Sequence, residues 1–251
     1  MIRFNNKLIR LNGNLAGKVI VPPEPPEPPA IITDMDFIYL ANDFDGNQIP
    51  NKATGTNAFG PYLEEGTITK NGTGADCYLS NGFGDNRLYI NLTQEQLYKM
   101  HPYNDGDTYT FFLRVYQDTS RSTSGIITWR SDGIDYKYMI RCESGQLQLH
   151  TSTGYNLGSN FLLTSDKVYK VIATKNNGTC SISAKNLNTG DVSSSYTYSP
   201  NMGTKMSSFT GYTISSEESY TDAIYALAGI PRATTEEEDE IIKTVLMNQS
   251  L

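Results

Sequence analysis

The stretch Thr108–Tyr116 reads TYTFFLRVY, and its alternation sets the fold class. Successive side chains of a β-strand point to opposite faces, so one face of this stretch is apolar and the other is mixed. The apolar face carries Tyr109, Phe111, Leu113 and Val115. The other face carries Thr110, Phe112, Arg114 and Tyr116. The pattern predicts one strand of two packed antiparallel sheets, which would bury one face and leave the other for solvent or a ligand.

The chain from residue 31 onward repeats this kind of signal. Short stretches rich in aromatic and β-branched residues are separated by turn formers such as Asp105-Gly106 and Asn177-Gly178. The further predicted strands are Phe37–Leu40, Thr67–Thr69, Cys77–Leu79, Arg87–Ile90, Gly125–Trp129, Tyr136–Arg141, Gln146–His150, Val168–Lys175, Cys180–Asn186, Val192–Tyr198, Ser208–Ser215 and Ala223–Ala228. This spacing favours a mostly β fold, an antiparallel two-sheet jelly-roll sandwich. Residues 42–61, rich in Gly, Asn, Pro and Asp, are predicted to form a loop.

Two helices are predicted. The first, Thr93–Met100, would make about two turns with its threonine as the N-cap. The second, Thr235–Leu246, is the stronger and closes the chain, because Thr235 and Glu238 fit a capping box. The acidic run Glu236–Glu240 is interpreted as a solvated helix start rather than a metal site.

The N-terminal part has a different composition. Val21–Pro29 reads VPPEPPEPP, which predicts a polyproline II rod about 25 Å long. Residues 1–20 are predicted to form a hairpin with Lys7–Leu11 as one strand and Asn12-Gly13 as the turn. A lone two-stranded hairpin is marginal in water, so we expect this segment to order against another subunit or a larger assembly. The alternative is that it packs back on the head as an extra strand.

These features divide the chain into three parts. Residues 1–20 are interpreted as an anchoring and oligomerisation segment, residues 21–30 as a linker and residues 31–251 as the head. The formal net charge of −7 argues against a nucleic-acid partner. No apolar run approaches the ~20 residues of a membrane span, and the N-terminus lacks the apolar core of a signal peptide.

The three cysteines are Cys77, Cys142 and Cys180. An odd number without close pairing is a poor disulfide framework. We therefore interpret them as buried thiols of a protein made in a reducing compartment, with one chance disulfide as the alternative.

The order of the strand signals is more specific than any one of them. GADCYL (74–79) and RLYI (87–90) are followed by YTFFLRV (109–115), IITWR (126–130), VYKVIAT (168–174) and CSISAKN (180–186). AIYALAGIPRATTEEE (223–238) then leads from a last strand through an Arg-Ala turn into a capped helix. Over about residues 36–251, this series resembles the concanavalin A-like and laminin-G-like jelly rolls. The resemblance implies a lectin-like fold and says less about function.

The whole layout is similar to fibre and decoration proteins of tailed-phage virions. In these, a short N-terminal segment grips the particle and a head faces outward beyond a proline-rich linker. This resemblance implies that residues 1–20 bind other virion proteins and that the chain forms a homo-oligomer, a trimer or a dimer.

Calcium is the cofactor to consider, because laminin-G-like domains often bind it at one rim. The candidate ligands are Asp43, Asp45, Asn104, Asp105 and Asp107. Calcium needs six or more converging oxygens. Asp and Asn are also ordinary turn residues, and this reading stays open.

A sugar would stack on an exposed aromatic ring with polar partners beside it. The candidate residues are Trp129, Arg130, Asp132, Asp135, Tyr136 and Tyr138. The alternative is that Trp129, the single tryptophan, belongs to the core, as large aromatic residues mostly do.

Catalytic patterns are missing from the sequence. The Glu-x-Asp-x-x-Glu run of jelly-roll glucanases does not occur, and neither do nucleophile-elbow or phosphate-loop motifs. The two histidines, His101 and His150, lie in a loop and at a strand end. The prediction from sequence is that the chain is not an enzyme.

These expectations combine into one hypothesis. The chain would be a non-enzymatic virion surface protein, anchored by its N-terminus and displaying a lectin-like head for adhesion to cell-surface glycans. Multivalent display would compensate for weak single contacts. The alternative hypothesis is a free carbohydrate-binding module or a glycan-active enzyme of the concanavalin A-like superfamily.

Overall fold

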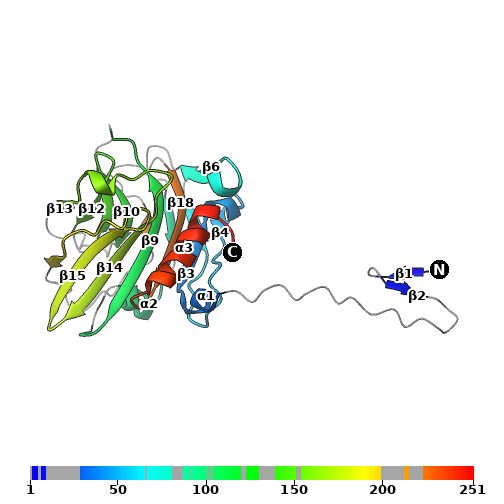
Figure 1. Ribbon diagram of the computed structural model, residues 1–251, viewed down its shortest axis with the longest axis horizontal. Coiled ribbons are helices and arrows are strands. Elements are labelled where there is room, and N and C mark those ends of the chain that lie inside the picture. Colours follow the sequence, from blue (N-terminus) through cyan, green and yellow to red (C-terminus); the bar gives the residue numbers. More distant parts are fainter. Residues whose placement is uncertain are drawn as a thin grey trace.

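The computed structural model describes most of the head and two short N-terminal strands. The described residues are 2–4, 7–9, 29–65, 67–80, 87–90, 92–100, 102, 104–119, 123–129, 139–150, 154–198, 212–214 and 223–251. Figure 1 shows the head as layered strands, with one helix, α3, laid across the outside of one layer.

In the described part of the head, the strands form two antiparallel sheets of eight strands each. The first has the order β13 (Gly154–Asn156), β12 (Gln146–His150), β11 (Met139–Glu143), β10 (Thr123–Trp129), β17 (Tyr212–Ile214), β8 (Arg87–Ile90), β5 (Tyr62–Glu65) and β4 (Gln48–Ile49). The second has the order β16 (Tyr196–Tyr198), β15 (Thr179–Asn186), β14 (Tyr169–Asn176), β9 (Thr108–Tyr116), β18 (Ala223–Ile230), β7 (Tyr78–Ser80) and β6 (Thr69–Asn71), with β3 (Phe37–Leu40) also paired to β18. The predicted mostly β, antiparallel two-sheet class is confirmed.

The main core lies between the two sheets. The apolar face of β9 is buried there, as predicted, and meets Ile140, Leu147 and Leu149 of the first sheet. Cys77, Cys142 and Cys180 belong to the same core. All three are buried and form no disulfide, which confirms their prediction as buried thiols.

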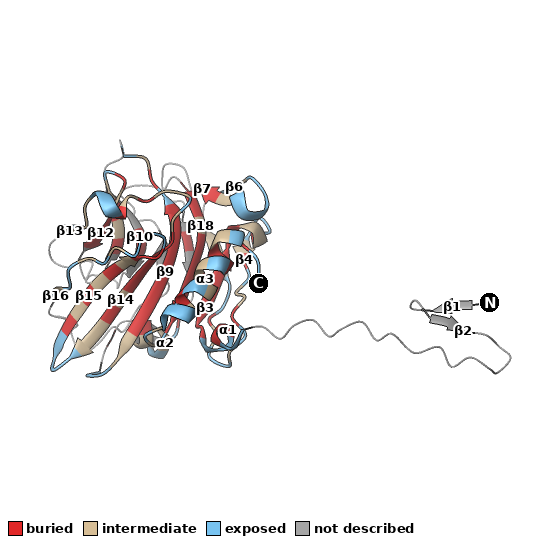
Figure 2. Cartoon of the chain, in the orientation of Figure 1, coloured by how far each residue is buried: buried red, intermediate tan, exposed pale blue. Residues whose placement is uncertain are grey.

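The outer face of β9 is buried as well, which corrects the expectation that it would stay open for solvent or a ligand. Phe112 packs there with Ile242 and Leu246 of α3 (Glu236–Asn248) in a second apolar cluster. Figure 2 shows the buried residues of β9 and β18 beside and beneath α3. The reason is that α3 lays its apolar stripe on β9 and β18, so this part of the second sheet is covered on both faces.

The three α-helices of the described chain are α1 (Ala30–Asp34), α2 (Gln94–Met100) and α3. The capping box that begins α3 is confirmed, since Glu238 N donates to Thr235 Oγ1 at 3.2 Å and Thr235 N donates to Glu238 Oε2 at 2.8 Å. Helix α1 was not predicted, because five residues are too few for a helical period. None of the described helices is long and apolar enough to cross a membrane.

The predicted strand bounds are confirmed for β3, β8, β9 and β12, and three short strands were missed. Of these, β4 lies inside residues 42–61, which were predicted as loop and also contain the 3₁₀ helix η1 (Ala41–Asp43). The strands β5 and β13 have four and three residues. Of the predicted strand Val192–Tyr198, only the last three residues form a strand, β16. Val192 makes a single β-bridge with Lys185. Strands this short carry too little alternation to be read locally.

The N-terminal hairpin differs from the prediction in its register. Strand β1 (Ile2–Phe4) pairs antiparallel with β2 (Lys7–Ile9), so the predicted strand from Lys7 has an N-terminal partner that was not predicted. Among the described strands, β1 and β2 pair with each other and join neither large sheet. Asn12-Gly13 and the proline stretch lie outside the described residues.

Candidate functional site

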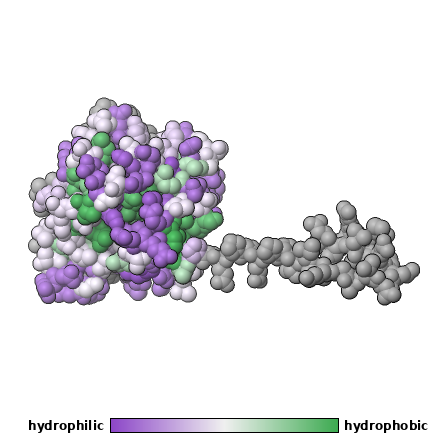
Figure 3. Space-filling model, in the orientation of Figure 1, coloured by the Kyte–Doolittle hydropathy of each residue, from purple (hydrophilic) through white to green (hydrophobic). Residues whose placement is uncertain are grey.

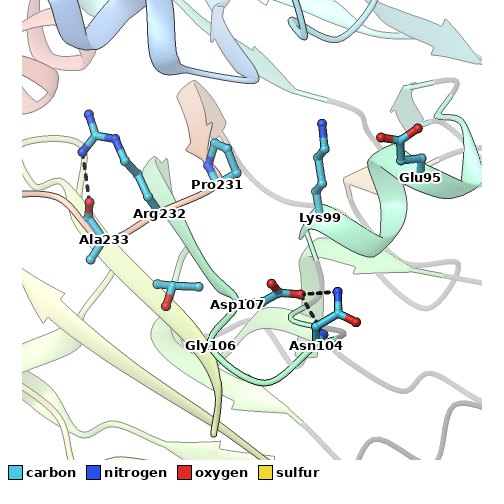
Figure 4. A pocket seen from close by; sticks show the side chains of 9 residues that line it. Glu95, Lys99, Asn104, Gly106, Asp107, Pro231, Arg232 and Ala233 are labelled. Carbon is cyan, nitrogen blue, oxygen red and sulfur yellow. Dashed lines mark hydrogen bonds between the residues drawn. The ribbon is translucent and has the colours of Figure 1, made fainter.

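A cleft opens at the end of the head where α2, the turn before β9 and the turn between β18 and α3 meet. It has a volume of about 570 Å³. In Figure 4, Glu95 and Lys99 of α2 lie on one side and Arg232 on the other, with Asn104 and Asp107 along the floor. A second lobe of about 420 Å³ continues from it toward α1 and residues 55–57. The two lobes share Lys99, Pro231 and Arg232.

Helix α2 carries two charged side chains, Glu95 and Lys99, and hydrogen bonds at its N-terminus fix its first turn. Thr93 Oγ1 accepts from Gln96 N at 3.2 Å, and Thr93 N donates to Gln96 Oε1 at 2.9 Å. This reciprocal capping satisfies two donors at the helix start and confirms the predicted N-cap. Residues four apart share a helix face, so Glu95 and Lys99 both reach the cleft.

The floor of the cleft is a turn held on both sides. Asp107 Oδ2 accepts from Asn104 N at 2.7 Å, and Asp105 Oδ1 accepts from Gly178 N at 2.8 Å. Gly106 N donates to Lys175 O at 2.8 Å. The turn is therefore pinned to the hairpin that joins β14 and β15.

Arg232 lines the side of the cleft opposite α2 and is held by two ion pairs. Its Nη2 atom lies 2.7 Å from Glu238 Oε1 and 2.8 Å from Asp34 Oδ2, which ties α3 to the end of α1. The Arg232 guanidinium holds the pKa of Glu238 down to about 2, with help from the backbone N–H of Thr235. Because Asp34 and Glu238 both pair with Arg232, its positive charge is already balanced by carboxylates of the protein.

Asp36 lies on the smaller lobe and is 2% exposed. Burial raises the pKa of its carboxyl from 3.8 to about 6, and the Tyr109 hydroxyl and the charge of Lys99 offset part of that rise. Its Oδ2 atom is buried from solvent. The backbone around Asp36 is fixed, since its N–H donates to Gly229 O at 2.9 Å and its carbonyl accepts from Phe59 N at 2.7 Å. A buried carboxyl with a shifted pKa in a cleft marks a candidate functional group.

Asp36→Asn is expected to stabilise the head at neutral pH. The folded pKa of about 6 lies above the ordinary 3.8, so the folded state keeps a proton that the unfolded chain releases as the pH rises. Stability is therefore lost between about pH 4 and pH 6, on the order of 3 kcal/mol at about 1.4 kcal/mol per pKa unit. Urea unfolding of both proteins at a series of pH values should show their free energies diverging as the pH rises. An equal difference at pH 4 and pH 7 would contradict this account.

The predicted calcium ligands serve as turn and ion-pair residues in the structure. Asp45 Oδ1 accepts from the backbone N–H groups of Asn47 and Gln48, both at 2.9 Å, and Asp43 lies 3.3 Å from Lys52. Asn104, Asp105 and Asp107 meet in the turn described above. In the part of the chain that the structure describes, no three His, Cys, Asp or Glu side chains form a metal-binding group.

The predicted sugar-stacking residues lie mostly outside the described residues, namely Arg130, Asp132, Asp135, Tyr136 and Tyr138. The backbone of Trp129 pairs with Tyr212, which in turn pairs with the buried Ile90. The cleft residues Asp36, Glu95 and Lys99 were missed by sequence reasoning. One signal was present: Asp36 interrupts the apolar run around MDFIYL (35–40), where an acid is costly.

Comparison with known proteins identifies a fold. No family model and no curated sequence matches the chain. A sialidase of Trypanosoma rangeli, solved with a difluoro-KDN ligand, superposes with a TM-score of 0.54 and 14% identity over 92% of this chain and 36% of the sialidase. The binding domain of botulinum neurotoxin DC in complex with rat synaptotagmin II gives 0.55 and 11% over 86% of this chain and 52% of that one. The same toxin domain with SialylT gives 0.53 and 12% over the same shares.

These neighbours establish a β-sandwich related to lectin-like jelly rolls. They also correct the prediction that the chain is not an enzyme, because sialidases are glycan-active enzymes and share this fold. The missing glucanase motif misled the prediction, since one catalytic pattern does not represent every activity found with a fold. The chain spans about a third of the sialidase and about half of the toxin domain.

Proposed function

We propose that the head binds carbohydrate and that the two-lobed cleft is its binding site. The observation that carries this proposal is the lining of the cleft, where fixed carboxylates, an amide and an ammonium group converge at the end of a lectin-like sandwich. Sugar hydroxyls both donate and accept hydrogen bonds, so they suit such a mixture. The solved sialidases and toxin domains that share the fold add support.

Lys99→Ala is expected to weaken glycan binding by about tenfold, the loss of one charged hydrogen bond. A glycan array would first find a ligand of the full chain, and calorimetry would then compare the variant with wild type. Lys243→Ala is the matched control, since Lys243 lies on α3 and pairs with Glu240 at 2.7 Å. Equal weakening by both variants, or by neither, would remove the cleft as the binding site.

A glycan-active enzyme is the second candidate. The buried carboxyl of Asp36, with its pKa raised to about 6, has the property that a general acid needs near neutral pH. Glycoside hydrolysis usually needs a second carboxylate, which Glu95 or Asp107 would supply. Release of a fluorophore from aryl glycosides by wild type but not by Asp36→Asn would favour this candidate over binding alone.

Attachment to a virion through residues 1–20 stays a prediction. We propose that this segment joins two or three copies to a particle, so that weak contacts of several heads act together. A chain without residues 1–29 should then be monomeric in light scattering and fail to join phage particles.

A further inference from the structure

We infer that the outer face of the second sheet carries a second sugar-binding site, in which a pyranose ring stacks on Tyr116 beside Tyr78 and Tyr225. The inference rests on the proposed function in one respect, that the head binds carbohydrate, and it places this contact away from the cleft. Thr108 lines the cleft at one end of β9, and Tyr116 lies at the other end, about 27 Å away by the rise of a β-strand.

Tyr116 marks the place where α3 stops covering the sheet. Side chains at alternate positions of β9 share its outer face. Along this face Phe112 is buried in the cluster under α3 and Arg114 is 4% exposed, whereas Tyr116 is 37% exposed. In Figure 2 the end of β18 that pairs with β7 extends past α3. This end of the outer face therefore lies open beyond the helix.

Two further tyrosines on this face are held in fixed positions. The rings of Tyr78 on β7 and Tyr225 on β18 have centroids 5.5 Å apart. The guanidinium of Arg114 lies 4.5 Å from the centroid of Tyr225, and four backbone carbonyls hold that guanidinium in place. The side chain of Ser165 hydrogen-bonds the hydroxyl of Tyr225. A surface that is fixed before binding loses little conformational entropy when a ligand arrives.

A β-bulge brings Tyr225 to this face. The pairing of β18 with β9 shifts register between Ile224 and Ala226. In a regular strand Tyr225 and Ala226 would point to opposite faces. Here Tyr225 contacts Arg114 and Ala226 belongs to the cluster under α3, so both lie on the outer face. Bulges that re-aim a side chain are frequent beside functional sites.

The size of the patch favours a small ligand over a protein. A standard protein interface takes about 800 Å² from each partner. A tyrosine buries roughly 150–250 Å² when it is covered completely. Tyr78, Tyr116 and Tyr225 are each partly exposed, so together they offer less than a second copy of the chain would need.

The chemistry of the patch matches a sugar. The faces of tyrosine rings carry negative partial charge, which the C–H groups on one side of a pyranose complement. Asp76 on η2 (Gly74–Asp76) and Asp166 lie close enough to Arg114 to act on its charge. Their carboxylates can accept hydrogen bonds from sugar hydroxyls, and tyrosine hydroxyls can both donate and accept. Apolar ring faces bordered by a few polar groups are the usual composition of a small-ligand site.

Tyr116→Ala is expected to weaken sugar binding by about tenfold, because it removes the ring on which the pyranose stacks. The full chain would be screened on a glycan array and by calorimetry with cellohexaose, maltohexaose and mannohexaose. Tyr116→Phe keeps the ring and should retain most of the affinity. Tyr155→Ala is the matched control, since Tyr155 stacks on Tyr196 at 4.3 Å at the opposite edge of the sandwich and should leave binding unchanged.

Lys99→Ala separates this site from the cleft. Weaker binding by Tyr116→Ala but not by Tyr155→Ala supports the second site, whatever Lys99→Ala does. Unchanged binding by Tyr116→Ala, with a loss in Lys99→Ala, would overturn the inference and leave the cleft standing. Binding of no glycan by the wild-type chain would overturn both. Self-association in light scattering that Tyr116→Ala abolishes, with sugar affinity unchanged, would assign the face to a second copy and overturn the inference.

Discussion

Lys170→Met is expected to destabilise the head by about 3–5 kcal/mol, because it leaves a buried carboxylate without its cation. Lys170 on β14 is 5% exposed and Asp239 on α3 is 3% exposed. The Lys170 Nζ atom lies 2.9 Å from both carboxylate oxygens of Asp239, and Thr234 Oγ1 donates to Asp239 Oδ1 at 2.6 Å. Urea unfolding followed by circular dichroism would measure the loss as a shift in midpoint at constant slope.

The double variant Lys170→Met with Asp239→Leu is the informative control. Replacing a buried ion pair by apolar residues is often neutral or even stabilising, because it removes the desolvation cost of both charges. The double variant should therefore recover most of the stability that the single variant loses. If the single variant is as stable as wild type, the Lys170–Asp239 pair contributes nothing to the stability of the head.

Arg114→Met is expected to cost about 3 kcal/mol and to loosen the C-terminal end of α3. Arg114 is 4% exposed on the outer face of β9. Its guanidinium donates to Ser165 O and Ala75 O at 2.8 Å, to Met247 O at 3.0 Å and to Leu246 O at 3.3 Å. Removing it leaves the buried carbonyl of Leu246 and the part-buried carbonyls of its other partners without this donor, and takes a cation from the negative end of a helix.

Hydrogen exchange would show where the loss of Arg114 acts. Amides of the last turn of α3 should exchange faster, while those of β11 and β12 in the first sheet should be unchanged at conditions that report local opening. Arg114→Lys keeps the positive charge but cannot donate to several carbonyls at once in the geometry of a guanidinium. It should therefore lower the free energy of unfolding by less than Arg114→Met does. Uniform exchange across α3 and β12 in Arg114→Met would contradict a local role.

The helices show which structural features can be predicted from residues that are neighbours in the sequence. Thr235 and Glu238 lie within one turn, so their capping box is visible in the sequence and holds in the structure. The cleft is different, because Asp36, Lys99 and Arg232 come from three distant segments that only the fold brings together. Sequence reasoning therefore favoured the polar run Asn104–Asp107, where the turn residues stand next to one another. In the structure Asp105 and Asp107 accept hydrogen bonds from backbone N–H groups there.

The alternation of Thr108–Tyr116, together with the similar short stretches along the chain, was enough to predict that the chain folds as packed antiparallel sheets. That is so because a strand exposes its two faces within successive residues. Only the tertiary structure decided that the second face of this strand is covered by α3, and that the carboxyl of Asp36 is buried beside a cleft at the end of the head. Burial and the pKa of Asp36 depend on which distant segments pack together, and no local pattern records that packing.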